Sequence, residues 1–239
     1  MTRYTIVDDN RPKLGLITLQ ADRTIEDDFR RLLPHDVSLL VSRVPSGLDV
    51  TLDSLAQMEG ALSDASSLFP VGHRFDAVGY GCTSGTAQIG VQKIAERICA
   101  GTDTSAISEP VSALIAACQA LSVNRIAMLS PYVASVSDRL RSVLDAAGVQ
   151  TPVFASFDEG NEAAVAQIDN GSIIAATIDM MAGADVQAVF LSCTNLRTMD
   201  VIAGLQDQLG IPVLSSNLVL AWDLLRLGGI EVATPRALL

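Results

Sequence analysis

The chain has 239 residues, of which 49% are hydrophobic and 18% charged, and its formal net charge at pH 7 is −11. This composition excludes a disordered chain, and an acidic balance without clustered Lys and Arg argues against nucleic-acid binding. No apolar run reaches the ~18 residues of a membrane span, and the first residues lack the apolar segment of a secretory signal. We therefore expect a cytoplasmic protein with no nucleic-acid partner and no membrane partner.

Strand-like and helix-like segments alternate along the first part of the chain. Pro34 lies just beyond the end of the first expected helix, and Thr24 is its expected N-cap. Strands are predicted over residues 13–19, 37–43, 77–80 and 104–107, and helices from residue 24, over 52–68 and 86–100, and from 110 to about 121.

The alternation then restarts, which predicts an α/β protein. Strands are expected over residues 125–129, 152–156, 188–191 and 213–214, and helices over 133–147, 173–181, 199–209 and 218–227. Such alternation is typical of parallel sheets covered by helices on both faces. We predict two pseudo-symmetric, four-stranded, flavodoxin-like halves with the site between them. The first half would span residues 1–118, joined by the C-terminal helix of 217–239, and the second 119–216.

An internal repeat supports the two halves. Residues 75–83 align with residues 186–194, and both segments run from an apolar stretch through a small residue to Cys-Thr, with the cysteines at 82 and 193, a difference of 111. The same difference places residues 15–18 on residues 126–129. One offset that holds over two separated segments indicates duplicated halves. Halves that face each other would bring two thiols to one cleft from opposite sides.

Cys82 and Cys193 are therefore the leading candidates for catalysis. Each stands where a strand meets the start of a helix, a position that favours a thiolate and collects ligands in parallel sheets. A buried structural role is the alternative for any single cysteine, but the matched pair favours function. Cys99 and Cys118 lie inside helical runs, and we expect them to be structural. The spacing of the four cysteines fits no metal site, so we expect no metal ligand.

Polar residues near the predicted strand ends complete the candidate site. Side chains and N–H groups after the two cysteines would bind an anion or simply cap helices; these residues are Thr83, Ser84, Thr194 and Asn195. Tyr132 would donate its hydroxyl to a substrate carboxylate, or serve as a core aromatic. Asn161 is either a ligand or a turn residue, and Asp22 lies in the first strand-to-helix loop.

These motifs resemble a known group of enzymes. Residues 80–85 (Tyr-Gly-Cys-Thr-Ser-Gly) and 191–195 (Leu-Ser-Cys-Thr-Asn) look like the two cysteine motifs of the aspartate/glutamate racemase superfamily. The run 130–133 (Ser-Pro-Tyr-Val), followed by Asp-Arg-Leu at 138–140, resembles the branch with maleate cis–trans isomerase and arylmalonate decarboxylase. Within that branch, residues 16–30 are most similar to the ectoine-utilisation protein EutA.

The resemblance implies an isomerase or racemase that needs no cofactor and holds a small carboxylate substrate between two cysteines. By this resemblance Cys82 would attack carbon and Cys193 would act as the acid, while Tyr132 and Asn161 would bind carboxylate. Arylmalonate decarboxylase has Gly at the position of Cys82, which argues against decarboxylation. We also expect a homo-oligomer.

One position departs from the pattern of the maleate isomerases. They carry Asn in the first loop, whereas this chain carries Asp22. A carboxylate there would repel a second substrate carboxylate and favour an amine-bearing substrate. We therefore expect a small carboxylate or amino-acid derivative, with maleate as the alternative substrate. A non-catalytic small-molecule binding protein with the same fold is the alternative of another class.

Overall fold

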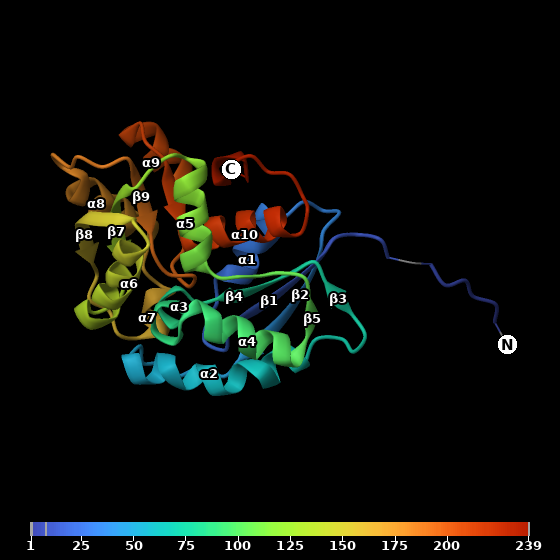
Figure 1. The fold of residues 1–239 in the computed structure, drawn as a ribbon. Helices are drawn as coiled ribbons and strands as arrows, with labels where there is room; N and C mark the ends of the chain where they lie inside the picture. Colours follow the sequence, from blue (N-terminus) through green and yellow to red (C-terminus); the bar gives the residue numbers. More distant parts are fainter. Residues whose placement is uncertain (1, 8, 239) are drawn as a thin grey trace.

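Two four-stranded parallel sheets form the framework of the protein in a computed structural model that describes residues 2–7 and 9–238 (Figure 1). The first sheet has the order β2-β1-β4-β6, and its strands are β1 (Lys13–Leu19), β2 (Ser38–Val44), β4 (Ala77–Gly81) and β6 (Ile107–Ser108). The second has the order β10-β9-β7-β8, and its strands are β7 (Arg125–Ser130), β8 (Gln150–Ser156), β9 (Ala188–Leu191) and β10 (Val213–Ser215).

The two sheets have the same topology, which confirms the predicted fold class. Read in chain order, each has its second strand at one edge, then its first, third and fourth, and every pairing is parallel. The repeat places β1 on β7 and β4 on β9. Leu14, Leu16 and Ile17 in β1, like Ile126 and Met128 in β7, are fully buried, because both faces of each sheet are covered.

Ten helices surround the sheets in the described residues. They are α1 (Ile25–Leu32), α2 (Leu52–Ser67), α3 (Thr83–Ile89), α4 (Val91–Gly101), α5 (Pro110–Ala120), α6 (Ala134–Ala146), α7 (Glu162–Val165), α8 (Asn170–Met181), α9 (Ile202–Leu209) and α10 (Ser216–Leu227), followed by a 3₁₀ turn at Pro235–Leu238. Figure 1 shows α2 and α4 on one side of the first sheet and α1 and α10 on the other. Helix α10 packs against α5 and β4. No helix in residues 2–7 and 9–238 is long and apolar enough to cross a bilayer.

Several elements differ from the sequence-based expectation. The helix expected over residues 86–100 begins at Thr83 and breaks at Gly90, whose φ of 95° is accessible mainly to glycine. The strand expected over 104–107 is divided between β6 and the short β5 (Asp103–Thr104), which pairs with β3 (Arg74–Phe75). Helix α7 was not predicted, because four residues are too few to show a helical period.

Thr24 occupies the N-cap position of α1, but its side chain makes no capping bond. Asp22 takes that role instead: its Oδ1 accepts hydrogen bonds from the backbone N–H of Thr24 (2.8 Å) and of Ile25 (2.9 Å). An acidic oxygen satisfies free N–H groups at a helix start as well as a hydroxyl does. The helix start therefore fixes one oxygen of the Asp22 carboxyl.

We expect opposite effects on stability from alanine at two helical glycines. A Cβ on Gly101, the last residue of α4, would meet the backbone of α2, with Ser67 N at 2.8 Å. Because backbone moves little, Gly101→Ala should lower the free energy of unfolding by about 1–3 kcal/mol. Gly60 lies exposed within α2, and a Cβ there meets nothing within 4 Å. Gly60→Ala should therefore raise the free energy of unfolding by about 1 kcal/mol. Urea unfolding of both variants tests this packing, and equal midpoints would contradict it.

Candidate functional site

The two candidate cysteines follow equivalent strands, but of the two only Cys82 stands at a helix start as expected: Cys193 is followed by turns, and α9 begins at Ile202. Cys82 follows β4 and is the N-cap of α3, and its Sγ accepts a hydrogen bond from the N–H of Gly85 at 3.2 Å. Cys193 follows β9, and its Sγ accepts from the N–H of Asn195 at 3.3 Å. Cys193 has a φ of 102°, a conformation that costs a non-glycine residue about 1–3 kcal/mol and is concentrated at functional sites.

Hydrogen bonds join the two cysteine loops across the halves. Thr194 Oγ1 donates to the backbone oxygen of Gly81 at 3.2 Å, at the end of β4. Thr83 Oγ1 donates to Ser216 Oγ at 2.7 Å, and the same Ser216 oxygen accepts from the N–H of Cys193 at 3.0 Å. The loops that carry the two thiols are therefore neighbours, and Thr83 and Thr194 hold them together.

Glu162 is the centre of a buried polar cluster beside Cys193. Its Oε1 accepts the hydroxyl of Tyr132 at 2.7 Å, and its Oε2 accepts Nδ2 of Asn195 at 2.8 Å. The Tyr132 oxygen lies 2.9 Å from Cys193 Sγ. Burial raises the pKa of the Glu162 carboxyl, while the bonds from Tyr132 and Asn195 oppose that rise. A continuous hydrogen-bonded chain thus connects a carboxyl, a phenol and a thiol.

Both thiols are closed off from solvent in this structure. Cys82 is 5% exposed and Cys193 2%, so the cleft expected between the two halves is closed in this structure. Burial, together with the nearby Glu162 carboxyl, raises the pKa of Cys82 to about 12 and that of Cys193 well above its usual range. Desolvation thus acts against the expected thiolates more strongly than the N–H donors favour them. Burial therefore favours the thiol form of both sulfurs in the closed site.

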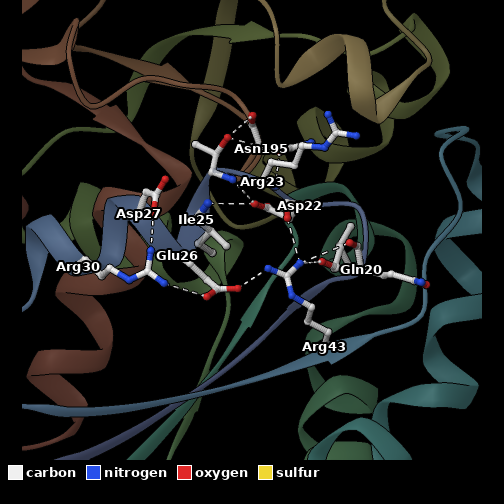
Figure 2. Close-up of polar contacts among 11 residues, drawn as sticks. Gln20, Asp22, Arg23, Ile25, Glu26, Asp27, Arg30, Arg43 and Asn195 are labelled. Carbon is white, nitrogen blue, oxygen red and sulfur yellow. Dashed lines mark hydrogen bonds and ion pairs between the residues drawn. The ribbon is translucent and has the colours of Figure 1, made fainter.

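Asp22 lies at the edge of the same cluster. It is 4% exposed, and its negative charge is near enough to raise the pKa of both thiols and of Glu162. Its Oδ1 caps α1, whereas its buried Oδ2 has no hydrogen-bond partner among the described residues. Figure 2 shows Arg23 extending away from Asp22, and Arg43 Nη1 donating to the backbone oxygen of Asp22 at 3.0 Å. Burial raises the pKa of the Asp22 carboxyl.

The remaining candidates are two polar residues, Ser84 and Asn161, and the two other cysteines. Ser84 is buried in the first turn of α3, next to Cys82. Asn161 uses its Oδ1 to cap α7, accepting from two backbone N–H groups, and so directs the next residue, Glu162, into the site. Cys99 is exposed on α4 and Cys118 is buried in α5. No group of three or more potential metal ligands occurs in the described part of the chain.

Sequence reasoning missed Glu162 as a site residue. A Glu directly after an Asn is typical of an ordinary helix start, where acidic residues are favoured by the helix dipole. Only the fold shows that this carboxyl is 4% exposed and reaches Tyr132 and Asn195. No spacing in the chain signals this contact, because Glu162 is separated from both partners by about thirty residues.

The Glu162–Tyr132–Cys193 chain can move a proton in either direction. The phenol carries one proton, so when it donates to Glu162 the Cys193 S–H donates to the phenol oxygen. When Glu162 is protonated instead, the phenol proton is free to bond the Cys193 sulfur. The arrangement therefore suits a thiol that delivers a proton to the substrate and is then reprotonated through Tyr132.

The sequence of the chain is similar to those of known enzymes. The family model described as arylmalonate decarboxylase matches residues 92–237, more than half of the chain. The arylmalonate decarboxylase of Bordetella bronchiseptica is 26% identical over 235 residues, which cover 91% of each chain. A maleate isomerase of Geobacillus stearothermophilus is 22% identical over 239 residues, covering 94% of this chain and 95% of its own.

Solved structures share the fold. The maleate isomerase of Pseudomonas putida S16 with maleate has a TM-score of 0.81 at 20% identity, covering 92% of this chain and 93% of its own. A Nocardia farcinica maleate cis–trans isomerase variant with a covalently bound succinylcysteine intermediate also has a TM-score of 0.81 at 20% identity, covering 96% and 98%. Together with the family match, these similarities show that the chain belongs to the arylmalonate decarboxylase family, within the Asp/Glu racemase-like superfamily that also contains the maleate isomerases.

Proposed function

We propose that this protein is an isomerase or racemase that acts without a cofactor on a small carboxylate or amino-acid derivative. One observation carries the proposal: two thiols end equivalent strands of a duplicated fold, and their loops meet in one buried polar cluster. The similarity of residues 16–30 to EutA extends the proposal to a derivative from ectoine breakdown.

The geometry supports different roles for the two thiols. Cys193 has the chain through Tyr132 to Glu162 behind it, which suits the group that delivers a proton. Cys82 would then remove a proton from the substrate or add to its carbon. In the removal case one proton leaves carbon for the Cys82 sulfur and another arrives from Cys193 on the opposite face, so the substrate keeps its composition. Because burial favours the thiol form, the Cys82 thiolate would form when the site opens to admit the substrate and the thiol proton passes to solvent.

Three alternatives are distinct from this proposal. Maleate cis–trans isomerisation is supported by the relatives that carry that name. Decarboxylation is supported by the relative from Bordetella bronchiseptica, but Cys82 favours an isomerase over a decarboxylase. A non-catalytic binding protein would need no proton chain behind Cys193, so the Glu162–Tyr132–Cys193 cluster argues for an enzyme.

A panel of four-carbon acids and amino-acid derivatives tests the proposal. We expect the purified protein, without added cofactor, to convert at least one of them to its stereoisomer or geometric isomer, with no loss of CO₂. Proton NMR in D₂O together with chiral chromatography would detect both kinds of product and any exchange at carbon. Release of CO₂ would establish a decarboxylase instead, and tight binding without conversion would establish a binding protein.

A further inference from the structure

Glu162 brings a carboxyl of the protein itself within hydrogen-bond distance of two side-chain donors of the site. Its two oxygens accept one bond each, from Tyr132 at 2.7 Å and from Asn195 at 2.8 Å. Two donors converging on the two oxygens of one carboxyl are the arrangement that recognises a carboxylate ligand. Here the arrangement is already filled from within the chain, because Asn161 caps α7 and holds Glu162 at this point.

Asp22 contributes a second acceptor: the Thr194 hydroxyl lies close enough to lower its pKa but donates to the backbone oxygen of Gly81. The residue is 4% exposed, its Oδ1 is fixed at the start of α1, and its Oδ2 is buried without a partner among the described residues. A buried acceptor without a partner is costly, so a ligand that donates a hydrogen bond to it gains affinity.

In the part of the chain that the structure describes, the Asp22 and Glu162 carboxyls have no cationic side chain bonded to them. Among residues 2–7 and 9–238, no Lys, Arg or His donates a hydrogen bond to the carboxyl oxygens of Asp22 or Glu162. Arg43 is the nearby cation, but its guanidinium bonds backbone oxygens and Glu26 (Figure 2). The surroundings of the thiols are therefore acceptor-rich and without a bonded counter-charge.

We propose that Glu162 and Asp22 set the substrate class of this site, by excluding a second substrate carboxylate and by accepting an amino group. The substrate would carry one carboxylate and one ammonium or amide N–H group. This inference rests on the proposed function only in placing the ligand between the thiols. A dicarboxylate would have to displace Glu162 from Tyr132 and Asn195 and would then lie beside two buried carboxyls with no bonded cation, which disfavours a second substrate carboxylate.

Two unreactive four-carbon probes test this selectivity. Succinate carries two carboxylates, whereas 4-aminobutyrate of nearly the same length carries one carboxylate and one ammonium group. Titration calorimetry should show that the wild type binds 4-aminobutyrate more tightly than succinate. Glu162→Ala frees both donors and removes the competing carboxyl, and it should improve succinate binding at least about tenfold. Glu162→Gln keeps the volume of the side chain, and Asp22→Asn keeps the oxygen that caps α1. Both variants should lower the ratio of 4-aminobutyrate affinity to succinate affinity.

The matched control is Glu96→Gln, which removes one charge from the exposed face of α4 and should leave the ratio unchanged. Glu162→Gln decides the outcome if Glu162→Ala does not fold. The inference is overturned if the wild type binds succinate as tightly as 4-aminobutyrate, if neither probe binds, or if Glu162→Gln leaves the ratio unaltered. None of these outcomes affects the proposed two-thiol chemistry, which loss of turnover in the cysteine variants tests separately.

Discussion

Cys82→Ser and Cys193→Ser should each reduce turnover by at least about 100-fold, the usual contribution of a positioned acid, base or nucleophile. Serine is nearly isosteric with cysteine, so the buried cluster should keep its shape. Its hydroxyl is far less acidic than a thiol and cannot act as a thiolate near neutral pH. The measurement is the conversion rate of the acid identified in the panel, with circular dichroism to confirm that each variant is folded.

The other two cysteines provide controls for this experiment. Cys99 is exposed on α4, and Cys99→Ser should leave both activity and stability unchanged. Cys118 is 1% exposed in α5, so Cys118→Ser places a hydroxyl in the core and should lower stability but not the rate of the folded enzyme. Turnover retained in Cys82→Ser or Cys193→Ser would refute the two-thiol mechanism.

Tyr132→Phe should reduce kcat by about 100-fold or more with a much smaller change in KM. Phenylalanine fills the same space but removes the oxygen that links Glu162 to Cys193. The Cys193 sulfur therefore loses its route for reprotonation from Glu162. The dependence of kcat on pH should also change, because Glu162 would no longer share a proton with the sulfur. Steady-state kinetics over a range of pH values would show both effects.

A second tyrosine serves as the control for the loss of a phenol oxygen. Tyr4 is 86% exposed, and Tyr4→Phe should be indistinguishable from the wild type. If Tyr132→Phe keeps the kcat and the pH profile of the wild type, the Glu162–Tyr132–Cys193 chain is a structural network and not a proton route.

The repeat made the framework predictable from the sequence. Its offset of 111 correctly equated β4 with β9, because each strand and the Cys-Thr that follows it keep their local sequence pattern. The break at Gly90 was not predictable, because φ at a glycine is not encoded by hydrophobic periodicity. Small shifts at helix ends, such as α9 beginning at Ile202 and not at residue 199, are of the same local kind.

The chemistry of the site was predictable only in part. Position in the chain placed Cys82 and Cys193 at strand ends, and the helix start suggested low pKa values for them. Burial reverses that suggestion, and burial is a property of the assembled halves. Glu162 illustrates the same limit, since its role depends on contacts with Tyr132 and Asn195 that no local pattern reveals.

A crystal structure of the Cys82→Ser/Cys193→Ser variant with the acid from the panel would test most directly that the two thiols enclose the substrate. Without thiols the acid should persist unconverted. We expect it to lie between residues 82 and 193, with each serine oxygen about 3–3.5 Å from a reacting carbon. An acid bound elsewhere, with residues 82 and 193 still closed off from it, would contradict the two-thiol arrangement.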